Sequence, residues 1–287
     1  MPEFDRADLS RIRLCALDID GTLLNSQHQL SPATSAAIAR IARAGCRVVL
    51  ASSRAPVAIP VVIRQLQGPR KLDVIAAQGA LVSTYRADHA SAHVFQNSMP
   101  TQQAADAVRL IHDSIPTASI NWFSSHSWYA NAWTDAIERE SDIVDAVPTV
   151  CALEDISEPA LKILVITAGA PESTLLVQRL AALGLNATTS HADYVEITAG
   201  GIDKATALRD LCRYRGIRLQ DVLAIGDGEN DVPMLRAAGL SAAPMNSVAS
   251  ALEAALLRVD SNDANGPAQL LTCLAEHLEK PTRTETS

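Results

Sequence analysis

The sequence predicts an α/β protein whose core is a doubly wound parallel sheet, with a smaller α+β unit inserted into that core. Two observations predict the core. Short apolar runs at residues 13–17, 47–51 and 222–225 are typical of strands buried on both faces. Helical patterns follow such runs after short links, as in parallel sheets covered by helices. The third observation predicts the insert, because this alternation is lost from about residue 85 to residue 193.

The first core segment begins with the strand at residues 13–17. Ser31 and Pro32 are typical of a helix N-terminus, with a capping hydroxyl followed by proline at the first helical position. Apolar residues at helical spacing follow, and Gly45 is expected to end this helix. Two further buried strands are predicted at residues 47–51 and 73–77.

The second core segment repeats this order near the end of the chain. A strand at residues 194–198 and a Gly200-Gly201 turn precede a helix predicted over residues 203–214. Another buried strand, at residues 222–225, is followed by a loop and by a helix that ends at Gly239. Helices are also expected at residues 247–257 and 267–279. The predicted core is therefore residues 1–84 and 194–287.

The predicted insert is residues 85–193. It contains helical patterns near 101–113 and 171–183, an apolar strand at 161–167, and an aromatic segment at 120–133. All three tryptophans lie in that segment. They could stack on a substrate, with His126 and Tyr129 near the leaving group, but alternating aromatic residues more often pack a sheet face, and we favour packing. We expect hinges near Ser83–Tyr85 and near Asp193.

Composition excludes several classes of protein. The chain has 24 basic and 32 acidic residues, a formal net charge of −8, which argues against a large nucleic-acid interface. Five cysteines, an odd number without a C-x-x-C pair, do not fit a closed disulfide framework. The polar N-terminus does not resemble a signal peptide, and no apolar run is long enough to span a membrane. We therefore expect a cytoplasmic protein without membrane or nucleic-acid partners.

Four short segments carry the candidate chemistry: residues 18–23 (DIDGTL), 51–54 (ASSR), Lys204, and residues 226–231 (GDGEND). Three of them follow a predicted parallel strand directly, and the carboxyl ends of such strands are where ligands bind in open α/β sheets. Lys204 lies in the first turn of a predicted helix, which is an unfavourable place for a cation unless it has a function. We expect all four segments to meet at one edge of the sheet.

Together these side chains predict a phosphoryl-transfer site. Asp18, Asp20, Asp227 and Asp231 would repel one another unless a cation joined them. Oxygen ligands without nearby histidine or cysteine favour Mg²⁺, which binds one or two carboxylates, water and a substrate phosphate. Lys204 could hold the other phosphate oxygens, and so could the Ser52 hydroxyl.

The nucleophile is then a carboxylate or an activated water, because no Ser-His-Asp, Cys-His or P-loop pattern is present. Its place at a rigid strand end favours Asp18, with Asp20 protonating the leaving oxygen and later activating water. Each residue also has an ordinary interpretation. The aspartates could cap a turn, Lys204 could be solvated, Ser52 could bond the backbone, Arg54 could form a salt bridge, and Asn230 could cap a helix.

In this order, DIDGTL, the serine segment, the lysine and GDGEND resemble the haloacid dehalogenase superfamily, and the mid-chain insert resembles its Cof-type subfamily, IIB, with a C2B cap. The resemblance covers residues 12–275. It implies a Rossmann-like core and an Mg²⁺-dependent phosphatase. Asp18 matches the nucleophile and Asp20 the acid/base, and both match metal positions along with Asp227 and Asp231. Lys204 matches the catalytic lysine that steadies the nucleophile and the phosphate, and Ser52, Ser53 and Asn230 match phosphate-contacting positions.

Two departures from the family pattern bear on the substrate. Ser52-Ser53-Arg54 stands where Thr-Gly-Arg is common, and Gln78-Gly79-Ala80 stands where Asn-Gly-Ala is common. Both lie on the rim that would face the cap. We expect hydrolysis of a small phosphorylated metabolite, a sugar phosphate or a phosphorylated cofactor, by a monomer or homodimer. The alternatives are a sugar phosphomutase with the same aspartyl-phosphate and a non-catalytic sensor of such metabolites.

Overall fold

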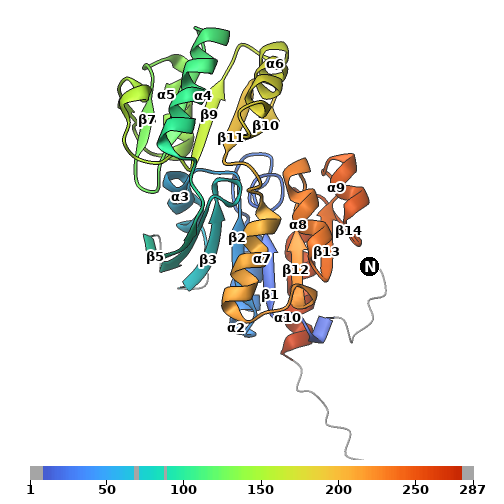
Figure 1. Cartoon of the computed structure of the whole chain (residues 1–287). Coiled ribbons are helices and arrows are strands. Elements are labelled where there is room, and N and C mark those ends of the chain that lie inside the picture. Colours follow the sequence, from blue (N-terminus) through green and yellow to red (C-terminus); the bar gives the residue numbers. More distant parts are fainter. Residues whose placement is uncertain (1–8, 68–70, 87–88, 280–287) are drawn as a thin grey trace, which may run out of the picture.

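The protein is built on two β-sheets, one above the other in the view of Figure 1. The computed structural model describes residues 9–67, 71–86 and 89–279. The larger sheet has eight strands in the order β14-β13-β12-β1-β2-β3-β4-β5. Its strands are β1 (Leu14–Leu17), β2 (Arg47–Ala51), β3 (Lys71–Ala76), β4 (Leu81–Arg86), β5 (His89–Gln96), β12 (Val222–Ile225), β13 (Leu240–Pro244) and β14 (Leu257–Val259).

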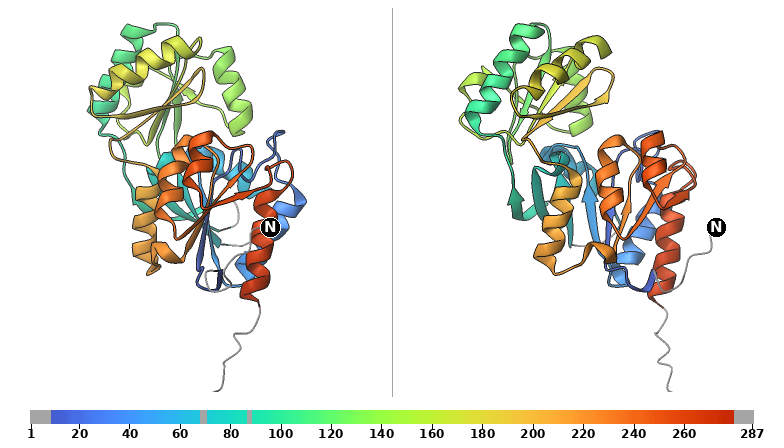
Figure 2. Two further views of the ribbon diagram at one scale, coloured as in Figure 1. Left: turned by 90° about the vertical axis from the view of Figure 1, so that its right-hand side faces the viewer. Right: turned by 45° about the vertical axis from the view of Figure 1, so that its right-hand side comes forward.

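Helices cover both faces of this sheet, as Figure 2 shows, which confirms the predicted doubly wound fold. One face packs against α2 (Pro32–Arg43), α3 (Ile59–Ile63) and α10 (Gly266–Leu278). The other packs against α7 (Lys204–Arg215), α8 (Val232–Ala237) and α9 (Ala249–Ala254). The central strands are buried on both faces, which explains why the sequence shows them as continuous apolar runs. Among the described residues of this sheet, only the β3–β4 and β4–β5 pairings are antiparallel.

Two predicted helix starts are found at the expected residues. Ser31 accepts a hydrogen bond from the Thr34 N–H at the start of α2, with Pro32 as the first helical residue. Asp203 caps α7 through a capping box with Thr206, so Lys204 is the first residue of that helix. The helix predicted over 247–257 is shorter than expected, because α9 ends at Ala254 and β14 follows it.

We call the unit built on the smaller, six-stranded sheet the cap. Its strand order is β10-β11-β9-β6-β7-β8, and the aromatic segment forms the β6–β7 hairpin. Its elements are α4 (Thr101–Ser114), β6 (Ser119–Phe123), β7 (Trp128–Ala130), α5 (Asp135–Val144), β8 (Thr149–Val150), β9 (Lys162–Ile166), α6 (Ala170–Ala181), β10 (Asn186–His191) and β11 (Tyr194–Thr198). Short 3₁₀ helices complete the described chain: η1 (Pro56–Ala58), η2 (Ala77–Gly79), η3 (Leu153–Asp155), η4 (Leu219–Asp221) and η5 (Glu229–Asp231).

The two faces of the cap sheet have different partners. Alternate residues such as Ile163 and Trp122 pack against α4 and α6 on the outer face. Their neighbours, among them Phe123 and Trp128, pack on the inner face with α5 and with Ala55 of the core. Trp122 and Trp128 are therefore buried packing residues, as we favoured, whereas Trp133 is half exposed.

The sheets divide the chain at other residues than predicted. β4 and β5 pair with β3, so residues up to 96 belong to the larger sheet. β11 pairs with β9 and β10, so residues 194–198 belong to the cap sheet. The predicted boundaries at 85 and 193 thus fall inside paired regions, because an alternating strand does not reveal its partner. From the strand pairing we assign the cap to residues 97–202.

The predicted hinge positions also lie within paired or hydrogen-bonded segments. Residues 83–85 lie in β4 and pair with strands on both sides. Asp193 lies in the turn between β10 and β11, and its carbonyl accepts the Thr167 N–H. The chain passes between the sheets near residue 97 and again at residues 199–203. Among the described residues, no helix has the length and apolar character needed to cross a membrane.

Candidate active site

The candidate site lies where three neighbouring parallel strands end. Asp18 follows β1, Ser52 follows β2, and the loop 226–231 follows β12. The register aligns these ends, since Leu17 pairs with Leu50 on one side and with Ile225 on the other. The topology therefore brings together three segments that are up to about 200 residues apart in the sequence.

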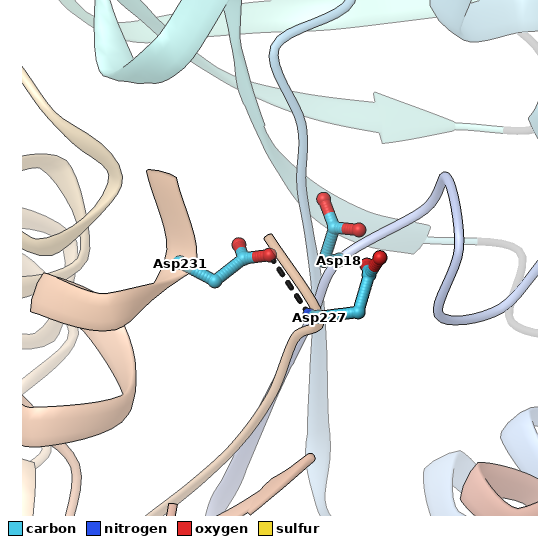
Figure 3. Close-up of side chains that lie close together, drawn as sticks. All are labelled: Asp18, Asp227 and Asp231. Carbon is cyan, nitrogen blue, oxygen red and sulfur yellow. Dashed lines mark hydrogen bonds between the residues drawn. The ribbon is translucent and has the colours of Figure 1, made fainter. Parts of the chain in front are cut away.

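Three aspartates form the centre of the site. One carboxylate oxygen from each of Asp18, Asp227 and Asp231 lies within 4.8 Å of the others. Figure 3 shows the Asp18 and Asp227 carboxylates side by side, with Asp231 reaching toward the backbone of Asp227. Asp18 and Asp231 are buried, and Asp227 is partly exposed. This is a set of hard oxygen donors, which suits a small divalent cation.

Lys204 lies between two of these carboxylates. Its Nζ is 2.6 Å from Asp18 Oδ1 and 2.7 Å from Asp231 Oδ1, and the side chain is 1% exposed. Burial acts to lower the pKa of Lys204, but the charges of Asp18 and Asp231 outweigh it and raise that pKa, so the amine is an ammonium. The unfavourable helix position is thus explained by the acidic partners.

One ammonium does not neutralise three carboxylates. Burial and the nearby charges of Asp231 and Asp227 raise the pKa of Asp18 well above its usual range, although Lys204 opposes them. Burial raises the pKa of Asp227 as well, against a hydrogen bond from Thr22. The residues therefore fit a divalent cation, because such an ion would supply the missing positive charge.

Asp231 has partners for both of its oxygens. Oδ1 accepts from Lys204, and Oδ2 accepts from the backbone N–H groups of Asp227 and Gly228, each at 3.0 Å. A Cβ on Gly226 would lie 2.5 Å from the Asp231 Cγ, so only glycine permits this approach. Asp231 therefore contacts both the backbone of loop 226–231 and the Lys204 ammonium.

Asp20 lies at the rim with Arg54. Arg54 Nε and Nη2 donate to the two Asp20 oxygens at 2.8 and 2.7 Å. Burial acts to raise the pKa of Asp20, but the hydrogen bonds and charge of Arg54 prevail and lower it. Arg54 therefore forms the salt bridge of its ordinary interpretation, and the same contact holds the Asp20 side chain in place.

The predicted phosphate-contacting residues surround this centre. Ser52 is buried, and its Oγ accepts the Arg54 N–H, which leaves the hydroxyl proton for another acceptor. Ser53 presents its backbone carbonyl to the cap residue Lys162. Asn230 does not cap α8, which begins after Asp231 without a side-chain cap; its amide donates to Gln78 Oε1 at 3.3 Å.

Sequence reasoning missed the cap side of this junction. Lys162 of β9 and Glu196 of β11 form a buried ion pair at 3.2 Å and contact core residues. Both are charged residues in otherwise apolar strands, on the same face as the inward-facing Leu164. A charged residue at an inward-facing position of each strand could have indicated this ion pair from the sequence.

A family model described as haloacid dehalogenase-like hydrolase matches residues 15–271. The chain belongs to the haloacid dehalogenase-like hydrolases. The family resemblance drawn from the motifs is therefore confirmed, and so is the expectation of an enzyme. The match includes the three aspartates and Lys204.

Individual relatives span nearly the same length. The pyridoxal phosphate phosphatase YbhA of Escherichia coli is 26% identical over 276 residues, covering 90% of this chain and 97% of that protein. The HMP-PP phosphatase of Cronobacter sakazakii is 28% identical over 246 residues, covering 79% and 82%. A solved haloacid dehalogenase-like hydrolase from Bacteroides thetaiotaomicron superposes with a TM-score of 0.79 at 25% identity, covering 92% and 99%.

Proposed function

We propose that this protein is an Mg²⁺-dependent phosphomonoester hydrolase that acts on small phosphorylated metabolites through an aspartyl-phosphate on Asp18. The observation that carries the proposal is the buried Lys204 ammonium between Asp18 and Asp231, with Asp227 beside them, at the carboxyl edge of the sheet. Relatives named as phosphatases of pyridoxal phosphate and of HMP-PP support the substrate class.

Asp18 and Asp227 are the proposed direct metal ligands, together with the backbone carbonyl of Asp20. When bound, Mg²⁺ would neutralise these carboxylates and polarise a phosphate oxygen. Asp231 was also expected to bind the metal. Because its oxygens already accept three hydrogen bonds, we propose that it supports the site by orienting Lys204 and the loop.

The proposed reaction has two steps. In the first, an Asp18 oxygen attacks phosphorus, the bond from phosphorus to the leaving oxygen breaks, and Asp20 gives that oxygen a proton. In the second, Asp20 takes a proton from water, the water oxygen attacks phosphorus, and the bond to Asp18 breaks. Lys204 holds Asp18 in place and balances charge, while Ser52 and Asn230 are placed to donate to phosphate oxygens.

Three of the cap cations favour a hydrolase over the mutase alternative. A mutase needs a cationic anchor for a second phosphate, but Lys162 is already paired with Glu196. Arg109 is exposed and paired with Asp106, and Arg179 donates to Ser114 on the outer helices. Neither arginine is bonded at the junction with the core.

The test is phosphate release from a panel of phosphomonoesters, including pyridoxal 5′-phosphate and sugar phosphates, with Mg²⁺ and with excess chelator. Asp18→Asn should abolish release, and Asp145→Asn, at an exposed position, should not. Acid quenching of wild-type protein during turnover should trap hydroxylamine-labile phosphate on the chain, and its absence from Asp18→Asn identifies the intermediate. Folded, Mg²⁺-loaded protein that releases phosphate from no ester contradicts the proposal.

A further inference from the structure

A chain of polar contacts runs from the cap to both phosphate-binding loops of the core. Lys162 Nζ donates to the Ser53 carbonyl at 2.9 Å and lies 3.2 Å from Glu196 Oε1. The other Glu196 oxygen accepts from Gln78 Nε2 at 3.2 Å. Gln78 Oε1 in turn accepts from Asn230 at 3.3 Å. One end of the chain thus touches loop 51–54, and the other touches loop 226–231.

The cap pair at the centre of this chain is buried. The Lys162 and Glu196 side chains are each 5% exposed. A buried ion pair gains little net stability, because desolvation offsets the attraction, and each charge needs further hydrogen bonds. Two of those bonds come from the core, from the Ser53 carbonyl and from the Gln78 amide. The pair therefore makes these two hydrogen bonds only when the cap lies against the two core groups.

Gln78 is placed by its backbone to join the two units. Its φ of 59° and ψ of 12° lie in the left-handed region, and the residue is buried. This conformation directs one amide to both the cap and Asn230. A glutamine reaches one methylene further than the asparagine common at this position in the resembled family. The Gln78 side chain, one of the departures noted in the sequence, is thus one of the two core contacts of the cap pair, and the backbone carbonyl of Ser53 is the other.

We propose that Lys162, Glu196 and Gln78 are positioning residues, which fix loops 51–54 and 226–231 relative to each other when the cap lies on the core. This role rests on the proposed phosphatase function. The cap would then set the spacing of the groups that bind the phosphoryl group. Because the same contacts form only when the cap lies on the core, this spacing would depend on the position of the cap.

The test compares Lys162→Met, Glu196→Gln and Gln78→Asn with Asp145→Asn. The last variant breaks the exposed cap–core ion pair between Arg64 and Asp145, which lies outside the chain of contacts and serves as a matched control. The readouts are kcat and KM for the best ester of the panel, and the Kd for inorganic phosphate with Mg²⁺ by calorimetry. Gln78→Asn is expected to fold, because asparagine accepts the left-handed backbone conformation of residue 78.

We expect the three variants to weaken phosphate binding and to lower kcat/KM by up to about 100-fold, as loss of positioning does. Lys162→Arg should restore part of the loss, and the control should match wild type. Unchanged phosphate Kd and kcat/KM in folded Gln78→Asn and Glu196→Gln would overturn the role while leaving the proposed function standing. A wild type that binds phosphate but hydrolyses no ester contradicts the function alone, and the phosphate Kd values then decide the positioning role.

Discussion

The guanidinium of Arg54 binds the carboxylate of Asp20 at two points, with N–O distances of 2.8 and 2.7 Å. This pair ties the end of β2 to the loop after β1. It fixes the side chain that we propose as the general acid and base, and it lowers the pKa of that side chain against the effect of burial. Arg54 therefore governs both the direction and the acidity of Asp20.

Replacing Arg54 by Met should shift the pH dependence of kcat/KM. Asp20 must be protonated to act as an acid in the first step, so kcat/KM falls as the pH rises through its pKa. Removal of Arg54 raises that pKa, and the alkaline limb should move to higher pH. Rates measured across the pH range check this shift, and Arg54→Lys should lie between the two profiles. An alkaline limb in the same place for Arg54→Met would contradict the assignment of Asp20.

Replacing Lys204 by Met should separate catalysis from metal binding. Loss of a buried donor to the reacting carboxylate should lower kcat by about 100- to 1000-fold. Mg²⁺ should bind at least as tightly as in wild type, because a cation beside Asp18 and Asp231 has been removed. Kinetics and Mg²⁺ calorimetry measure the two effects, with Lys71→Met at an exposed strand end as control. Weaker Mg²⁺ binding by folded Lys204→Met would contradict this electrostatic account.

Glu140→Gln should change how stability depends on pH. Burial raises the pKa of Glu140 above its ordinary value of 4.5, although Lys162 and the Tyr194 hydroxyl oppose it. A carboxyl with a raised pKa in the folded state contributes stability below pH 4.5 that is lost as the pH rises through the folded pKa.

The wild-type Tm should therefore fall relative to Glu140→Gln as the pH rises from about 4 toward neutrality. The amide keeps an oxygen for the Tyr194 hydroxyl, so packing is preserved. Thermal unfolding of both proteins over this range makes the comparison. If the Tm values of the two proteins changed with pH in the same way, a raised pKa of Glu140 would be contradicted.

Gly21→Ala should impair metal binding through a direct clash. Gly21 has a φ of 77°, and an added Cβ would lie 2.2 Å from Asp227 Oδ2. Gly45 has a φ of 87° but no atom within 4 Å of such a Cβ, which makes Gly45→Ala a control for backbone strain alone. Gly45→Ala should lose about 1 to 2 kcal/mol of stability through backbone strain, and Gly21→Ala should lose more because of the added clash. Only Gly21→Ala should lose the rise in Tm that we expect Mg²⁺ to produce in wild type; an equal rise in both variants would contradict the proposed clash.

The core could be predicted from sequence because its signals are local. Apolar runs such as residues 222–225 record burial on both faces, and Ser31 and Asp203 mark helix starts through hydrogen bonds that span three residues. The juxtaposition of Asp18 with Asp227 followed from topology, since the ends of parallel strands share one edge. The poor fit of Lys204 at a helix N-terminus predicted only that this lysine has a function; its acidic neighbours Asp18 and Asp231 are seen in the structure.

The cap boundary and the cap contacts could not be predicted in this way. Whether β11 pairs with β9 or joins the core depends on backbone partners about 30 residues away, which an alternating strand does not encode. The ion pair of Lys162 and Glu196 depends on the register between two strands and on the position of the cap over Gln78. These are long-range relations, which the local sequence pattern does not record.

Both crossings between the units pass the turn at Gly79 and Ala80. At the first crossing, the Asn97 N–H donates to the Ala80 carbonyl. At the second, the Asp203 carbonyl oxygen lies so close to Gly79 that a Cβ on this residue would be only 2.4 Å from it. The cap therefore leaves and rejoins the core at one place, as a self-contained branch. Recombination at this place could replace the cap without changing the strand order of the core sheet. Selectivity for the leaving group could then evolve while Asp18 and its neighbours kept their positions.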